Sequence, residues 1–193
     1  MFRRKYEFKP DRPHSGTLNK LYITPKQRQR LFKWFLTTLL LLAVSLLQDV
    51  IFSRVHIFGA VTDLVGCAIL LFCIMQDPEN GCVFALISSS IYYFSGSAPG
   101  SYVIALLTCL GLLISIFRQC YLQKGFGSTF LCLAGAMLIY ELSLFIIGAF
   151  LGQIPLSRFR YFCITAGISL AAMPILYPVF LAIGKIGGES WKE

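Results

Sequence analysis

The chain has 193 residues, of which 56% are hydrophobic and only 13% are charged. Soluble domains carry about 25% charged residues, and the mean hydropathy of this chain is +0.71. This composition excludes an ordinary soluble domain and indicates a protein that is mostly surrounded by lipid. The length suits one compact membrane domain.

Basic residues are concentrated before the first long apolar segment. Ten of the 17 Lys and Arg residues precede Trp34. We interpret residues 1–23 as a basic cytoplasmic arm with little regular structure. Because the arm adjoins a membrane segment, we expect it to contact anionic lipid rather than nucleic acid. The expected headgroup contacts are Lys26, Arg28, Arg30, Lys33 and Trp34.

Six apolar segments predict an all-α integral membrane protein, a compact bundle of about six transmembrane helices within residues 24–184. The segments are 25–51, 57–75, 82–94, 102–117, 129–151 and 161–183. The third and fourth are shorter than the roughly 20 residues of a perpendicular crossing, so we expect them to be tilted, extended at their ends or partly re-entrant.

Local signals predict where these helices begin, end and bend. Thr24, Pro25 and Gln27 form a capping box for the first helix. "QDPENG" predicts a turn after the second segment, and "RQCYLQKGFG" predicts a polar loop after the fourth. Pro174 and Pro178 predict a kink in the last helix.

The distribution of Lys and Arg predicts that both termini are cytoplasmic. With the N-terminus inside, 14 basic residues lie on the inner side, including a short tail at 185–193. Only Arg54, Arg158 and Arg160 lie on the outer side. This asymmetry follows the positive-inside rule for a multi-pass membrane protein.

The sequence contains no recognised catalytic signature. It has no H-E-x-x-H, no G-x-S-x-G, no P-loop and no paired aspartates of an intramembrane protease. We therefore expect a protein that is not an enzyme and has no cofactor. The seven cysteines lack C-x-x-C spacing, so we interpret them as small hydrophobic residues. His14 and His56 are too few for a zinc site.

Two acidic residues lie within apolar segments. Glu141 is near the middle of segment 129–151, where a charge costs at least about 2.5–3.5 kcal/mol, so it should face the bundle interior. It is either a ligand or proton site, or a hydrogen-bonded carboxyl that ties helices together. For Asp63 we favour a helix start in which Thr62 is the cap and Asp63 a first-turn acid. The alternative is a deep functional site.

Small residues at four-residue spacing predict helix packing. Gly148 and Gly152 form G-x-x-x-G, and Gly167 and Ala171 form a looser version. Such spacing lets two helices approach closely in a membrane.

The order of features from Gln48 to Gly100 resembles MreD, the rod shape-determining membrane protein family of bacteria. "QDVIFSRVHIFGAVTDLVGCAILLF" is similar to its first loop and second span, in which a glycine is followed by Pro-Asp. Gly59 and Asp63 match, while a threonine replaces the proline. "QDPENGCVFALISSSIYYFSGSAPGS" resembles its next block, with Gly81 and Gly100 at the matching glycines. The family often has a glycine-rich third span that ends in an aspartate, whereas here serines replace the glycines and Ser95 or Ser97 stands at the position of the acid.

This resemblance implies a non-enzymatic inner-membrane scaffold of the cell-elongation machinery, which helps maintain cell shape. It implies binding to an MreC-like bitopic protein and, through it, to MreB and the peptidoglycan-synthesis enzymes. The candidate partner or ligand contacts are then Asp63, Glu141, Gly59, Gly81 and Gly100.

A second class has a similar size and span number: the substrate-binding subunits of energy-coupling vitamin transporters. Such a subunit binds a small molecule near the outer face and often carries a seam of small residues in its first span. The first segment here is rich in leucine, with Ala43 and Ser45 as its only very small residues. This composition favours the scaffold.

Overall fold

The computed structural model describes residues 25–52, 54–55, 59–121 and 125–185, and the regular elements within them are all helical. The expected all-α fold is thereby confirmed. The elements are α1 (Pro25–Leu47), a π-helical segment η2 (Gln48–Phe52), α2 (Leu64–Met75), α3 (Pro78–Phe94), α4 (Tyr102–Tyr121), α5 (Phe126–Phe150), a 3-10 turn η3 (Leu156–Arg158), α6 (Phe159–Ala171) and α7 (Met173–Gly184).

Several sequence-based expectations lie outside the described residues. These are the arm at 1–23, the capping residue Thr24, the side chain of Lys26 and the tail beyond Lys185. Both histidines lie outside as well.

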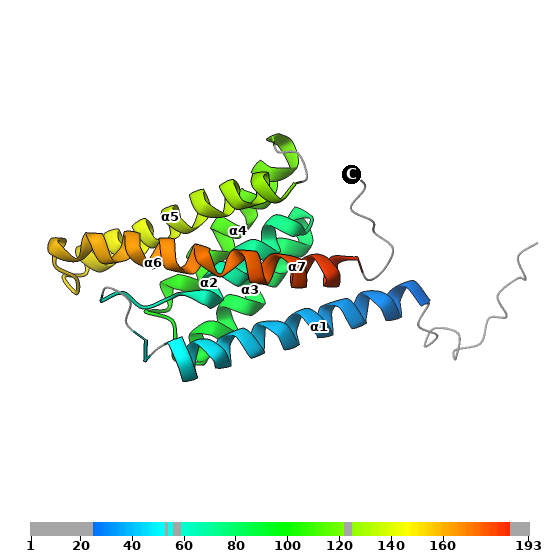
Figure 1. Ribbon diagram of the computed structural model, residues 1–193, viewed down its shortest axis with the longest axis horizontal. Coiled ribbons are helices and arrows are strands. Elements are labelled where there is room, and N and C mark those ends of the chain that lie inside the picture. The colour runs from blue at the N-terminus through cyan, green and yellow to red at the C-terminus, as the bar shows by residue number, and fades with distance from the viewer. Residues whose placement is uncertain (1–24, 53, 56–58, 122–124, 186–193) are drawn as a thin grey trace, which may run out of the picture.

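Helix α2 is the centre of the bundle. Each of its twelve residues is buried, and it contacts every other α-helix that the structure describes. Figure 1 shows α1 and α5 at opposite edges of the bundle, with α6 and α7 passing in front of α2. A helix that is apolar on all sides is stable only when other helices surround it, and its sequence "LVGCAILLFCIM" meets that condition.

Three helical segments are long and apolar enough to cross a membrane. They are Gln27–Phe52, Tyr102–Tyr121 and Phe126–Phe150, and α6 with α7 form a fourth if that bent pair is one span. With 12 residues, α2 is only about 18 Å long, less than the roughly 30 Å hydrocarbon core of a bilayer. The described residues therefore contain three or four candidate membrane-spanning helices, which supports a membrane protein.

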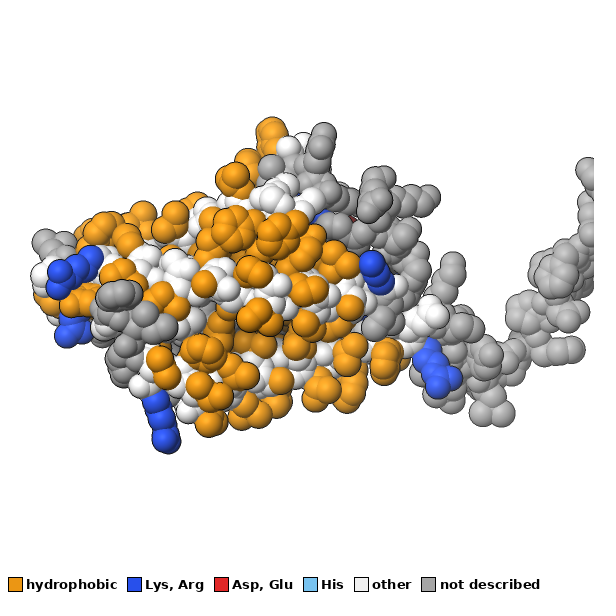
Figure 2. Space-filling view, in the orientation of Figure 1, with side chains coloured by type: hydrophobic (Ala, Val, Ile, Leu, Met, Phe, Trp, Pro, Cys, Tyr) orange, Lys and Arg blue, Asp and Glu red, His pale blue; other side chains and the backbone are white. Residues whose placement is uncertain are grey.

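The surface of the bundle is strongly apolar. Large hydrophobic side chains are exposed on the long helices, including Phe35 (65%), Leu113 (63%) and Leu131 (75%). In Figure 2, hydrophobic side chains cover the middle of the visible face, and Lys and Arg side chains lie toward its two ends. An apolar belt between charged ends is the surface expected of a helical bundle in lipid.

The structure corrects two predicted loops. Helix α3 begins at Pro78 with Asp77 as its N-cap, so most of "QDPENG" is helical rather than a turn. Proline is favoured at the first helical position because its missing N–H has no partner there in any case. Helix α4 extends to Tyr121 and α5 begins at Phe126, so six of the ten residues of "RQCYLQKGFG" are also helical.

The predicted kink in the last segment is confirmed. Helices α6 and α7 meet at Ala172 with a bend of 49°. Pro174 has no N–H to donate to the carbonyl of Leu170, so the helix breaks just before it. Pro178 lies inside α7.

Candidate functional site

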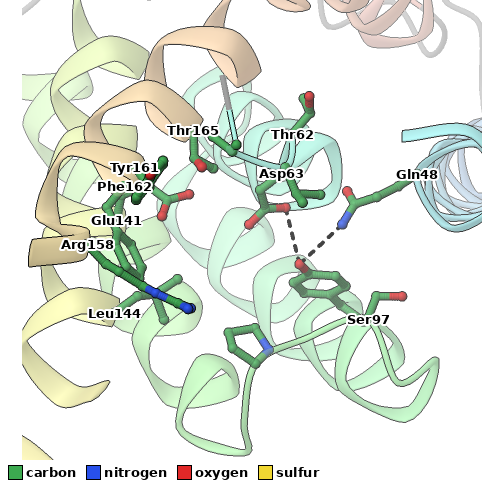
Figure 3. Close-up of a pocket in the computed structure, with 15 residues that line it drawn as sticks. Gln48, Thr62, Asp63, Ser97, Glu141, Leu144, Arg158, Tyr161, Phe162 and Thr165 are labelled. Carbon is green, nitrogen blue, oxygen red and sulfur yellow. Dashed lines mark hydrogen bonds between the residues drawn. The ribbon is translucent and has the colours of Figure 1, made fainter. Parts of the chain in front are cut away.

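A polar cavity of about 520 Å³ lies beside the start of α2. Its walls come from η2, the segment before α2, α3, the connection between α3 and α4, α5, η3 and α6 (Figure 3). The polar side chains that line it are Gln48, Thr62, Asp63, Tyr92, Ser97, Glu141, Arg158, Tyr161 and Thr165. Two of these, Asp63 and Glu141, were singled out from the sequence, and the fold brings them to one place.

Asp63 fixes the start of α2. It is the N-cap, and its Oδ1 accepts a hydrogen bond of 2.8 Å from the backbone N–H of Gly66. The N–H of Val65 donates to Oε1 of Gln48 at 2.8 Å, and the N–H of Asp63 donates to Oγ of Ser169 at 2.8 Å. Side chains from three elements thus satisfy the first N–H groups of α2, which have no partners within the helix. The cap is Asp63 itself and not Thr62 as predicted.

A hydrogen-bonded chain connects this cap to η2 and α3. The hydroxyl of Tyr92 donates to Oδ1 of Asp63 at 3.3 Å and accepts from Nε2 of Gln48 at 3.4 Å (Figure 3). Gln48 and Tyr92 are both buried. Sequence reasoning missed both residues. The signal available for Gln48 was a polar side chain at the end of an apolar helix, whereas Tyr92 is one of nine tyrosines with no distinguishing neighbour.

Glu141 projects into the cavity from the middle of α5. Only 4% of its surface is exposed, and Figure 3 shows its carboxyl group directed toward Asp63. Its Oε1 atom is buried and has no hydrogen-bond partner among the described residues. Glu141 therefore faces the bundle interior as expected, and no serine or tyrosine binds this oxygen.

A second, smaller cavity lies on another side of Glu141. It has a volume of about 130 Å³, and apart from Glu141 its lining is apolar: Leu138, Leu142, Phe159, Phe162 and Cys163. The carboxyl group is thus placed between a large polar cavity and a small apolar one between α5 and α6.

The three glycines of the candidate site have different surroundings. Gly59 lines the cavity with φ of 80°, and a Cβ there would lie 3.0 Å from the ring of Tyr161. Gly81 is buried in the first turn of α3 rather than in a turn between helices, and a Cβ there would make only ordinary contacts. A Cβ at Gly100 would clash with the ring of Tyr102. Gly81 and Gly100 do not line the cavity.

The two small-residue pairs expected to pack helices together lie in different surroundings: Gly148 is buried, and a Cβ there would clash with Cδ1 of Ile154. The carbonyl of Gly148 accepts hydrogen bonds from the N–H groups of Gln153 (3.0 Å) and Ile154 (3.3 Å), and Gly152 has φ of 68°. This pair forms the C-terminal turn of α5. Gly167 and Ala171 are exposed on α6, so any close helix contact there would involve another chain.

The expected headgroup contacts divide into two groups. Arg28 and Arg30 are exposed. Lys33 is half-buried and donates from Nζ to Oε1 of Gln76 at 3.2 Å, and the ring of Trp34 lies 6.1 Å from that of Phe84. Lys33 and Trp34 therefore also fasten α1 to the bundle.

The side chains that line the cavity can bind a ligand through charge pairing and hydrogen bonds. Within the described residues, no three His, Cys, Asp or Glu side chains are grouped closely enough to hold a metal ion. The seven cysteines are free thiols, and Cys67 and Cys73 are in the core. The chain matches no protein-family model, no curated protein and no solved structure.

Proposed function

We propose that this protein is a non-enzymatic scaffold of the bacterial cell-elongation machinery, similar to MreD. In this proposal it is a six-span protein of the inner membrane that binds an MreC-like bitopic protein. Through that partner it connects peptidoglycan synthesis to MreB and helps maintain cell shape.

The observation that carries the proposal is the position of the segment that resembles MreD. That segment contains α2 and α3, and α2 is the buried centre of the bundle. The structure requires particular residue types at two of its matching positions. Gly59 has a positive φ, which favours glycine, and Asp63 is the N-cap of α2. The resemblance thus rests on residues that the architecture depends on, which supports a relation in fold.

The arrangement of the helix ends supports the proposed topology. Figure 1 places the start of α1 and the end of α7 at the same end of the bundle. The end of α1 and the start of α6 lie at the opposite end of the long axis (Figure 1), and Arg54 and Arg158 are close to these helix ends in the chain. Two cytoplasmic termini and an outer side poor in basic residues agree with this geometry. Six crossings require α2 and α3 to be completed by their flanking segments.

The experiment is a pull-down of the tagged full chain from its native membrane in mild detergent, with mass spectrometry of the bound proteins. We expect recovery of an MreC-like bitopic protein with wall-synthesis enzymes. A tagged multi-pass protein of unrelated function is the control. Deletion of residues 1–23 tests the arm separately, because unchanged membrane placement and partner recovery would remove it from the proposal.

The polar cavity favours a second candidate, a substrate-binding subunit of an energy-coupling vitamin transporter. Its volume of about 520 Å³ is within the roughly 300–1,000 Å³ range of small-molecule sites. It is lined by Arg158, which belongs to the predicted outer side. Recovery of a transport ATPase module with a bound vitamin, in place of wall-synthesis proteins, would establish this candidate and refute the scaffold.

A further inference from the structure

We propose that the cavity beside the start of α2 is a binding site for an organic cation, which it holds through a protonated amine or a guanidinium group. Glu141 is the main contact, and Asp63 adds a second carboxyl group. This inference stands on the cavity itself and holds for either candidate function.

The first observation is that two buried oxygens line the cavity without partners. Oε1 of Glu141 and Oγ1 of Thr62 have no hydrogen-bond partner among the described residues, and the two side chains are only 4% and 3% exposed. A buried polar atom without a partner is costly, so such atoms usually mark the place of an additional group. The two come from different elements, α5 and the segment before α2, and they border one shared space.

The second observation is the charge of the lining. Two carboxylic side chains border the cavity, and one atom of Asp63 is already engaged, because Oδ1 accepts from both Gly66 and Tyr92. Asp63 therefore contributes a second carboxyl group, while Glu141 has an oxygen open to a donor. An ammonium group has three donors and no acceptor, so it can donate to the open oxygen of Glu141.

Size and the remaining walls favour an organic cation over a metal ion. The volume of about 520 Å³ suits a small molecule, and two carboxyl groups supply too few oxygens for Ca²⁺, which takes six to eight. The rings of Tyr161 and Phe162 also line the space, and aromatic faces attract ammonium and guanidinium groups. Arg158 is the one basic residue of the described lining, and it is exposed, so it belongs at the rim.

The test measures binding to the purified full chain in detergent by calorimetry. The probes are cadaverine, agmatine, lysine and arginine, and pentane-1,5-diol is the neutral match for cadaverine. We expect the cationic probes to bind and the diol not to bind. Glu141→Gln keeps the shape of the side chain and should weaken binding by at least about 30-fold. Glu79→Gln makes the same chemical change on the exposed first turn of α3 and should leave binding unchanged.

The outcomes separate the proposal from a cavity that holds only water. Failure of every cationic probe to bind, equal binding of the diol, or unchanged affinity in Glu141→Gln would each overturn it. If Glu141→Gln does not fold, the comparison of amine with diol on the unchanged chain decides. Micromolar binding of a probe supports the proposal, whereas binding only at about millimolar concentration is no more than non-specific association and would overturn it.

Discussion

Replacing Asp63 with alanine should destabilise the protein more than any other removal of a helix cap in the described chain. The carboxyl group accepts from the N–H of Gly66 at 2.8 Å and from the hydroxyl of Tyr92 at 3.3 Å, and it is 8% exposed. Losing an N-cap costs about 1 kcal/mol, and a buried donor left without an acceptor costs about 1–3 kcal/mol.

These two costs are partly offset. The hydroxyl of Tyr92 keeps its contact with Gln48, and removing a buried carboxylate recovers some desolvation free energy. We therefore expect Asp63→Ala to lower the free energy of unfolding by about 2–4 kcal/mol. Asparagine retains the accepting oxygen and is an equally good N-cap, so Asp63→Asn should cost less than about 1 kcal/mol.

Reversible unfolding in mixed detergent and SDS micelles, followed by far-UV circular dichroism, measures this difference. Asp77→Ala is the matched control, because Asp77 is the N-cap of α3 but its side chain makes no capping hydrogen bond and is exposed. Its effect should stay within about 0.5 kcal/mol. An effect of Asp77→Ala as large as that of Asp63→Ala, or an equal loss in Asp63→Asn, would refute the capping argument.

Three further predictions concern packing and topology. Gly59→Ala should destabilise by about 1–2 kcal/mol, because φ of 80° and the ring of Tyr161 at 3.0 Å leave no place for a Cβ, whereas Gly81→Ala should be nearly silent in the same unfolding assay. The side chain of Leu107 is fully buried (0% exposed), so Leu107→Ala should lower the free energy of unfolding by about 2–5 kcal/mol. A loss of less than about 0.5 kcal/mol is typical of an exposed leucine and would contradict the place of Leu107 in the core. In variants whose other cysteines are replaced, a membrane-impermeant maleimide should label Ser101→Cys in intact cells but Cys120 only after permeabilisation. The reverse pattern would contradict cytoplasmic termini.

The long apolar helices were predictable because composition alone determines them. Helix α5 was expected at 129–151 and lies at 126–150, since a continuous apolar run has few alternatives in a membrane. Proline and glycine were harder to interpret, because both are common in turns and also at particular helix positions. In "QDPENG" the proline starts α3 and the glycine lies inside it. The same letters also fit a helix start, with Asp77 as N-cap and Pro78 at the first helical position, so the local pattern allows both a turn and a helix.

The members of the site were only partly predictable. An acid in an apolar run is conspicuous because its burial is costly, so Asp63 and Glu141 could each be selected from the sequence. Asp63 and Glu141 are 78 residues apart in the chain. They meet at one cavity because α5 packs against the start of α2, and only the fold shows this packing. Gln48 enters the site because η2 is a π-helical turn, and a single sequence does not indicate the register of such a turn.

The buried position of α2 has a consequence for the order in which the protein is made. Of the helices that surround α2, only α1 precedes it in the chain, and α3 to α7 are synthesised later. A newly inserted α2 is too short to cross the bilayer alone and, until those helices arrive, its cap at Asp63 lacks Tyr92 and Ser169. The centre of the protein is thus made before most of its periphery and becomes buried only when the later helices pack on it. Nascent chains that stop before α7 should therefore be substrates for membrane quality-control proteases.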